Sequence, residues 1–232
     1  RQALEANPEN QDVHYLLGRE LAAQGNDIEA KAAFARALEL HPDDARAHNE
    51  MGALCERAGD IEQAKRHYEE ALRVVPHFAY VISKMGRILA REGKPDEAIA
   101  RYEAAIALEP EHQDIHYLMG CELAAQGRKA AAKTKFEDAL ELNPEDARAH
   151  NDLALLIEDD DPEAAAAHYA QALEIAPNFT LSLNNWGNLL AKQGRPDEAK
   201  AKYELALDIR PADEFAYYNL ARLAEAGGEG LA

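Results

Sequence analysis

Residues 79–112, AYVISKMGRILAREGKPDEAIARYEAAIALEPEH, carry the signals of two short helices joined by a turn. Gly93 is a residue type that ends helices, because glycine enters the left-handed backbone region without strain. Pro95 follows at a place suited to the first turn of a second helix. Pro110 prevents that second helix from continuing. The segment therefore predicts a helical hairpin whose first helix spans about 80–92.

This pattern recurs along the whole chain with a period of 34 residues, shortened once to 33. The recurring prolines are Pro8, Pro42, Pro76, Pro110, Pro144, Pro177 and Pro211. A small residue, an aromatic residue and an alanine keep the same spacing, as at Gly86, Tyr102 and Ala105. One hairpin cannot bury its apolar side, whereas stacked hairpins can. The period therefore predicts a solenoid.

A longer period lies over the first. The segment DVHYLLGRELAAQG at 12–25 returns as DIHYLMGCELAAQG at 114–127, 102 residues later. In the same way, DDARAHNEM at 43–51 returns as EDARAHNDL at 145–153. These copies indicate that a block of three repeats was duplicated. Equivalent surface residues should therefore recur in every third repeat.

The composition excludes several classes of protein. Alanine contributes 48 of the 232 residues, whereas Val, Ile and Thr together contribute 16. Because alanine is the best helix former and the other three favour strands, we expect an all-α fold. The formal charge of −18 repels phosphate backbones and argues against nucleic-acid binding. No apolar run approaches the roughly 18 residues that a membrane span needs.

The cysteines and the chain start bear on the cellular context. Cys55 and Cys121 predict two free thiols packed as small apolar residues rather than a disulfide framework. Free thiols favour a reducing, cytoplasmic compartment. The first residues, RQALEANPEN, show neither an initiator methionine nor a signal-peptide pattern. We therefore expect a longer parent protein.

The residue types that perform catalysis do not form a recognisable site. Four of the nine histidines share one position of the repeat: His14, His48, His116 and His150. That position places them about a helix-pair width apart, whereas metal ligands must converge on one ion. The two serines lie in no nucleophile elbow, and no phosphate-binding glycine loop is present. We expect no enzyme activity, no metal and no cofactor.

The single deletion falls in an acidic turn at Glu158, Asp159, Asp160 and Asp161, where the usual turn glycine is missing. Aspartate tolerates turns and caps helices, and Asp161 directly precedes Pro162. Four carboxylates could also bind a cation, but no calcium-loop spacing accompanies them. We interpret the segment as a solvated turn with Asp161 as a helix cap.

The repeat resembles the tetratricopeptide repeat (TPR) family, whose units carry Gly or Ala, Ala, an aromatic residue, Ala and Pro at these offsets. The resemblance covers the repeats 11–44, 45–78, 79–112, 113–146, 147–179 and 180–213, with partial repeats at 1–10 and 214–232. It implies one all-α domain over 1–232, a right-handed superhelix of helical hairpins. One departure is visible at repeat position 4, where the family usually has Trp. This chain has His14, His48, Ile82, His116, His150, Leu183 and Tyr217 there.

The resemblance implies a concave groove lined by the first helix of each repeat. Repeat positions 2, 5, 6, 9, 12 and 13 lie opposite the apolar side of these helices, and we call them the groove stripe. The candidate peptide-binding residues on it are Tyr15, Arg19, Asn49, Arg57, Tyr80, Lys84, Arg87, Arg91, Tyr117, Asn151, Asn184, Asn185, Asn188, Tyr218, Asn219 and Arg222. The stripe holds nine basic and eight acidic residues, a net of +1, so the rest of the chain carries −19.

This charge contrast predicts a partner that the acidic exterior would reject. Lys84, Arg87 and Arg91 share a repeat whose stripe has no acidic residue, and arginine can clamp a carboxylate with two hydrogen bonds. We therefore hypothesise a protein or peptide partner with acidic character. The alternative is that these basic groups only offset the acidic exterior. The Lys/Asn clamp of some family members is absent or altered, because Leu181 and Phe215 stand in its lysine positions.

Three functions remain open from the sequence. The first is a protein–protein interaction scaffold. The second is a substrate-docking region of a larger enzyme similar to the O-linked N-acetylglucosamine transferases, some of which hold peptide backbones with groove asparagines. The third is a self-assembling array. The last helix would expose Tyr217, Leu220 and Leu223, which favours self-association through that end.

Overall fold

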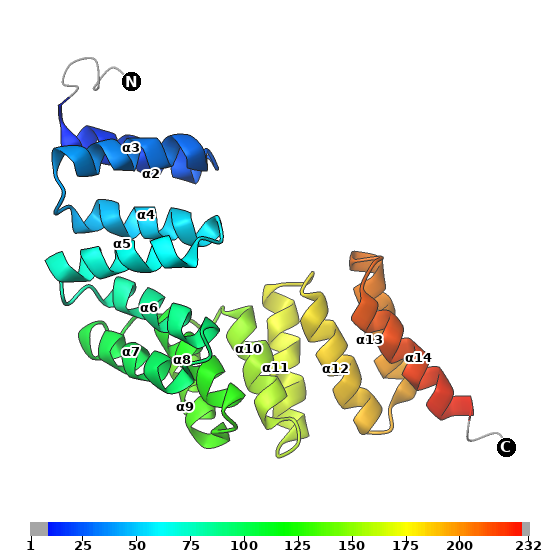
Figure 1. The fold of residues 1–232 in the computed structure, drawn as a ribbon. Coiled ribbons are helices and arrows are strands. Elements are labelled where there is room, and N and C mark those ends of the chain that lie inside the picture. The colour runs from blue at the N-terminus through cyan, green and yellow to red at the C-terminus, as the bar shows by residue number, and fades with distance from the viewer. Residues whose placement is uncertain (1–8, 229–232) are drawn as a thin grey trace. The chain divides into compact units, whose positions relative to one another are not determined.

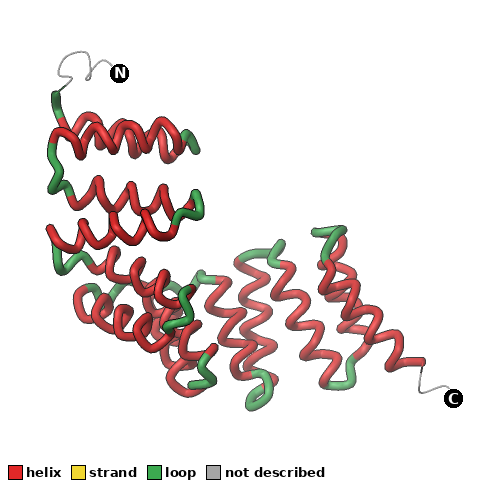
Figure 2. The backbone as a smooth tube through the Cα atoms, viewed as in Figure 1, coloured by secondary structure: helices red, strands yellow, loops and turns green. Residues whose placement is uncertain are grey.

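The computed structural model describes residues 9–228, in which every regular element is an α-helix and the connections are short loops and turns (Figure 2). Two compact units divide the chain, Arg1–Pro110 and Glu111–Ala232, here called the N-terminal and C-terminal units. Most of the partial repeat expected at 1–10 lies outside the described residues, as do the last four residues of the partial repeat 214–232. No helix in the described part of the chain is both long and apolar enough to cross a membrane.

Helical hairpins build both units (Figure 1). In the N-terminal unit they are α2 (Gln11–Ala23) with α3 (Asp27–Leu40), α4 (Ala45–Arg57) with α5 (Ile61–Val74), and α6 (Ala79–Arg91) with α7 (Pro95–Leu108). In the C-terminal unit they are α8 (Gln113–Ala125) with α9 (Lys129–Leu142), α10 (Ala147–Ile157) with α11 (Pro162–Ile175), and α12 (Thr180–Lys192) with α13 (Pro196–Ile209), followed by α14 (Glu214–Gly228). We call the even-numbered helices first helices and the odd-numbered ones second helices. The predicted all-α repeat fold is confirmed, whereas a single right-handed superhelix over 1–232 stays a prediction.

Local signals define the ends of the helices. Gly93 follows α6 with a φ of 73°, in the left-handed region that glycine enters without strain. Pro95 is the first residue of α7, where its missing N–H would have no helical partner. At the start of α4, the Asp44 carboxylate accepts hydrogen bonds from the backbone N–H groups of Arg46 and Ala47 at 2.9 and 3.3 Å. The sequence pattern therefore fixes where each hairpin turns.

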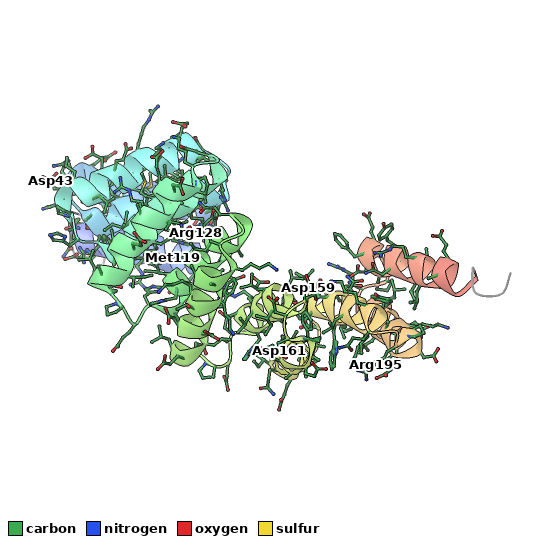
Figure 3. All side chains as sticks on the ribbon, turned by 90° about the horizontal axis from the view of Figure 1, so that it is seen from below. Asp43, Met119, Arg128, Asp159, Asp161 and Arg195 are labelled. Carbon is green, nitrogen blue, oxygen red and sulfur yellow. The ribbon has the colours of Figure 1, made fainter. Side chains whose placement is uncertain are left out.

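The acidic turn between α10 and α11 behaves as a capped turn. Asp159 and Asp161, both labelled in Figure 3, belong to this turn. The Asp161 carboxylate accepts a hydrogen bond from the backbone N–H of Ala164 at 3.0 Å, so the predicted cap is confirmed. The described residues contain no group of three or more His, Cys, Asp or Glu side chains that could hold a metal ion.

The core of each hairpin is the aromatic side chain of its second helix, packed under a small residue of its first helix. The aromatic residues are Phe34, Tyr68, Tyr102, Phe136, Tyr169 and Tyr203, all at most 2% exposed. A Cβ atom added to Gly18 would lie 2.7 Å from the Phe34 ring, and one added to Gly86 would lie 2.9 Å from the Tyr102 ring. Glycine is therefore needed where the first helix meets the ring.

Candidate functional site

Polar contacts join the first helices of successive repeats within each unit. In the N-terminal unit, Arg46 on α4 donates to Asp12 on α2 at 2.8 Å. The duplicated pair in the C-terminal unit is Arg148 on α10, which donates to Asp114 on α8 at 2.9 Å. Neighbouring first helices therefore lie side by side, and their stripe residues form a common surface within each unit.

A hollow of about 440 Å³ lies between α4 and α6 in the N-terminal unit. We call it the basic hollow. Its lining residues are Glu50, Ala53, Glu56, Arg57, Tyr80, Lys84, Arg87 and Arg91. Four of these side chains are basic and two are acidic, a local net charge of +2 on a chain of net charge −18. This is the predicted arrangement of Arg57, Lys84, Arg87 and Arg91 around one surface.

Glu56 neutralises part of this basic cluster. Its side chain is only 8% exposed and accepts hydrogen bonds from Arg87 at 2.6 Å and from Arg91 at 3.3 Å. The Tyr68 hydroxyl donates to its other oxygen at 3.2 Å. The expectation of a basic group without acidic neighbours, drawn from repeat 79–112 alone, is therefore incomplete. The acid comes from the preceding repeat.

Lys84 is the least neutralised cation of the basic hollow. Its ammonium lies 4.8 Å from the centroid of the Tyr80 ring, and no described carboxylate lies within 4.0 Å of its Nζ. Arg57, in contrast, donates to Asp27 at 2.7 Å. Burial raises the pKa of Glu50, and the charges of Arg19, Arg57 and Lys84 oppose this rise. An anionic ligand would therefore meet Lys84 first.

The corresponding surface of the C-terminal unit is a chain of hydrogen bonds across α8, α10 and α12. Tyr117 donates to Asp152 at 2.8 Å, and Asn151 donates to the second oxygen of Asp152 at 2.9 Å. Asn185 on α12 then donates to Asn151 at 3.1 Å. Burial raises the pKa of the nearby Cys121 thiol to about 12, which keeps the thiol protonated. These residues form a neutral, amide-rich surface without a reactive nucleophile.

A second hollow, of about 410 Å³, lies on α12 to α14 in the same unit. Its lining residues are Glu158, Asn188, Ala191, Lys192, Tyr203, Asn219, Arg222, Leu223 and Ala226. Lys192 donates to Glu158 at 2.6 Å, and the Tyr203 hydroxyl donates to Asn188 at 2.8 Å. Nearby helix positions expose Leu181, Phe215 and Tyr218, at 46%, 67% and 63%. Apolar side chains therefore accompany this hollow, unlike the basic hollow.

The structure buries part of the stripe that the sequence placed on the surface. The buried candidates are Tyr15, Asn49, Asn151, Asn184 and Asn219, each at most 8% exposed. The exposed or half-buried candidates are Arg19, Arg57, Tyr80, Lys84, Arg87, Arg91, Tyr117, Asn185, Asn188, Tyr218 and Arg222. Repeat position 5 accounts for most of the difference, because it faces the neighbouring first helix. Tyr15, for example, lies under the Arg46 guanidinium, 4.7 Å from the ring centroid.

The two units differ in stripe charge. The basic stripe residues are Arg19, Arg46, Arg57, Lys84, Arg87 and Arg91 in the N-terminal unit and Arg148, Lys192 and Arg222 in the C-terminal unit. The acidic ones are Asp12, Glu50 and Glu56 in the N-terminal unit and Asp114, Asp152, Glu158, Asp159 and Glu225 in the C-terminal unit. The N-terminal stripe therefore carries +3 and the C-terminal stripe −2. The overall value of +1 hides this contrast.

Sequence reasoning missed a pair of histidine contacts. His48 Nδ1 lies 3.1 Å from His67 Nδ1, and the duplicated His150 Nδ1 lies 2.9 Å from His168 Nδ1. The signal was present, because both histidines of each pair recur after 101 or 102 residues. Their second partners also match, since His48 Nε2 lies 3.0 Å from the Pro42 carbonyl oxygen and His150 Nε2 lies 3.0 Å from that of Pro144.

Family models described as tetratricopeptide repeat match residues 1–54 and 56–120, 117–178, and 181–213. The chain belongs to the tetratricopeptide repeat family. Proteins of this family bind other proteins or peptides, which gives the chain a protein-interaction role at this level. Comparison with curated protein sequences finds no match.

Several solved structures share the fold of this tetratricopeptide repeat chain. PilF of Pseudomonas aeruginosa is 23% identical, with a TM-score of 0.81 over 91% of this chain and 97% of that one. PilW, described as a type IV pilus biogenesis factor, is 18% identical, with a TM-score of 0.82 over 90% of this chain and 98% of that one. YrrB, described as having an unusual peptide-binding site, is 23% identical, with a TM-score of 0.63 over 80% of this chain and 96% of that one. At these identities the likeness shows the fold.

Proposed function

We propose that the chain is a non-catalytic scaffold whose groove stripe binds a peptide segment of a partner protein. The basic hollow of the N-terminal unit takes the acidic part of that segment. The observation that carries this proposal is the gathering of Arg57, Lys84, Arg87 and Arg91 around one hollow of a strongly acidic chain. Complementary charge selects a partner and speeds its encounter, while the acidic exterior repels the same segment elsewhere.

The hydrogen-bonding capacity of the basic hollow supports this role. Arg87 and Arg91 each use one printed contact on Glu56, whereas a guanidinium has five N–H donors. Arg87 Nε is buried and has no acceptor among the described residues. Arginine can therefore hold Glu56 and still bind a partner carboxylate with two parallel hydrogen bonds. Tyr80, at 37% exposed, adds a flat apolar contact beside Lys84.

The C-terminal unit would bind a different kind of segment. Its exposed Leu181, Phe215 and Tyr218 offer apolar and aromatic contacts, which commonly anchor interfaces. The side-chain amides of Asn185 and Asn188 are half-buried and offer both donors and acceptors to a peptide backbone. We therefore assign the uncharged part of the partner to this unit. The peptide-binding site described for YrrB is consistent with such a use of the fold.

Selection of peptides from a random display library on the immobilised chain tests this function. The selected peptides should be rich in Asp and Glu, with apolar residues in addition. Their affinity should fall as NaCl is raised from 0.1 to 1 M, because the Debye length shortens from about 10 Å to about 3 Å. Selected peptides without acidic enrichment, or affinities that do not change with salt, would contradict the role of the basic hollow.

A further inference from the structure

The last first helix, α14, has an uncovered face that its six counterparts keep covered. In the other first helices, repeat positions 4, 8 and 11 pack against the second helix of the same repeat. In α12, for example, Leu183 and Leu190 are at most 2% exposed against the core residues Ala199 and Tyr203. The same positions of α14 are Tyr217, Ala221 and Ala224, which we call the open face.

All three residues of the open face are exposed. Tyr217 is 57% exposed, and both alanines are exposed as well. The other side of α14 is docked, because Ala216, Leu220 and Leu223 pack against the core of the preceding hairpin. The expected exposure of Tyr217 is thus confirmed, and the expected exposure of Leu220 and Leu223 is wrong to the extent that α13 covers them. The open face is therefore presented by a helix that is itself held in place.

Six internal examples show what covers this face. Each second helix presents a small residue, an aromatic residue four positions later and a small residue three positions after that. The sets are Ala30, Phe34 and Ala37; Ala64, Tyr68 and Ala71; Ala98, Tyr102 and Ala105; Ala132, Phe136 and Ala139; Ala165, Tyr169 and Ala172; and Ala199, Tyr203 and Ala206. Every member is at most 2% exposed. An alanine at position 8 is compatible with this packing, since Ala154 is fully buried in the hairpin that contains Tyr169.

Glu225 specifies the chemistry of the missing aromatic residue. It stands at repeat position 12, and the two other glutamates at this position are Glu56 and Glu158. Each of those accepts a hydrogen bond from the tyrosine of its second helix, at 3.2 and 3.1 Å. Glu225 does not follow from the duplication, because the equivalent residues of the two earlier copies, Ala22 and Ala124, are alanines. A tyrosine hydroxyl placed as in the other hairpins would find an acceptor in Glu225.

We infer that the open face of α14 is a docking site for an amphipathic helix from another polypeptide, carrying tyrosine between two small residues in the spacing of the second helices. A folded second copy cannot supply this helix, since its own second helices are buried against their first helices. This surface is distinct from the groove stripe, because Phe215, Tyr218 and Arg222 occupy stripe positions and Tyr217 does not. Self-association through α14, which the sequence favoured, is the competing occupancy.

A peptide of residues 195–210, which contains α13, is the test ligand, titrated with the full 232-residue chain under fluorescence polarisation. Saturable binding is expected. Replacing Tyr203 of the peptide by Ala should weaken it at least tenfold. In the chain, Ala221→Lys should weaken binding at least tenfold, because lysine fills the space of the incoming ring. Ala201→Lys, the same change at an exposed position of α13, should leave binding unchanged, and circular dichroism should show both variants folded.

Glu225→Gln should weaken the tyrosine peptide more than a peptide in which Tyr203 is Phe. The inference is overturned if no saturable binding appears at a few hundred micromolar peptide, or if binding ignores Ala221→Lys. It is also overturned if sedimentation shows a dimer of the chain that Ala221→Lys dissociates, since the occupant would then be a second copy. None of these outcomes depends on the groove, so they leave the proposed function untouched.

Discussion

The Tyr68 hydroxyl donates a hydrogen bond of 3.2 Å to Glu56 across the α4–α5 hairpin. The other oxygen of Glu56 accepts from Arg87 of the next repeat at 2.6 Å. One carboxylate therefore links the aromatic core of a hairpin to a cation of the groove stripe. The C-terminal unit repeats the arrangement, with Tyr169, Glu158 and Lys192 at 3.1 and 2.6 Å.

Tyr68→Phe and Tyr169→Phe should each lower the free energy of unfolding by about 1–2 kcal/mol, because each leaves a nearly buried carboxylate without one donor. The two losses should add, since the residues lie in different units and share no partner. Urea unfolding followed by circular dichroism measures both. If either single change is neutral, the tyrosine–glutamate bond does not contribute to stability.

Gly18→Ala should destabilise the first hairpin, because the added Cβ would lie 2.7 Å from the buried Phe34 ring. Overpacking of this kind costs about 1–3 kcal/mol, and the gain in helix propensity from glycine to alanine is at most about 1 kcal/mol. Ala154→Gly, at the same repeat position, should also destabilise, by about 1 kcal/mol, because this helix has adapted to alanine. Thermal melting of both variants provides the measurement. A stabilising effect of Gly18→Ala would show that the ring moves freely.

The two histidine pairs should make the protein less stable in mild acid. When neutral, His67 can donate through Nδ1 to His48 Nδ1, while His48 Nε2 donates to the Pro42 carbonyl. Burial, and then His48, lower the pKa of His67, with Lys31 acting in the same direction and Glu70 against it. Burial and then His150 lower the pKa of His168 in the same way. A second proton on either pair would set two N–H groups against each other.

The sign follows from these lowered pKa values. Between the folded pKa and the ordinary value of about 6.5, the unfolded chain binds more protons, so stability falls as pH falls through that window. Urea midpoints measured from pH 8 to pH 5 should decline more steeply for the natural chain than for His67→Asn combined with His168→Asn, since asparagine keeps a donor without titrating. Parallel pH profiles would assign the acid sensitivity to other groups.

The hairpins could be predicted because their signals are local. Gly93, Pro95 and the recurring alanines act within one repeat, and a fixed period multiplies each signal. The burial of Tyr15 and Asn151 could not be predicted in the same way. Repeat position 5 looks polar or aromatic on its own helix, and only the neighbouring first helix makes it an interior position.

The pairing within the basic hollow was also beyond the sequence. Counting charges placed Glu56 and Arg87 on the same stripe, but 31 residues separate them, and a count gives no distance. The division of stripe charge into +3 and −2 needed the boundary between the two units, which the regular period conceals. The histidine pairs, in contrast, could have been found by comparing all residue types in the duplicated blocks rather than the groove candidates alone.

The most direct test of the central claim is the affinity of an acidic peptide, selected on the natural chain, for two charge-reversal variants. Lys84→Glu changes the cation of the basic hollow that has no carboxylate within 4.0 Å in the described part of the chain. Arg101→Glu makes the same kind of change at an exposed position of α7, outside the stripe. Arg87 is unsuitable for this purpose, because its reversal would also remove the counter-ion of Glu56.

Isothermal titration calorimetry at 0.1 M salt gives both dissociation constants, and melting temperatures verify that the variants remain folded. The account predicts that Lys84→Glu weakens binding at least tenfold, the loss expected for one charge-assisted contact of about 1.5–3 kcal/mol. It predicts that Arg101→Glu changes the dissociation constant less than twofold. Equal effects of the two variants, or unchanged binding by Lys84→Glu, would contradict the claim that the basic hollow is the docking surface.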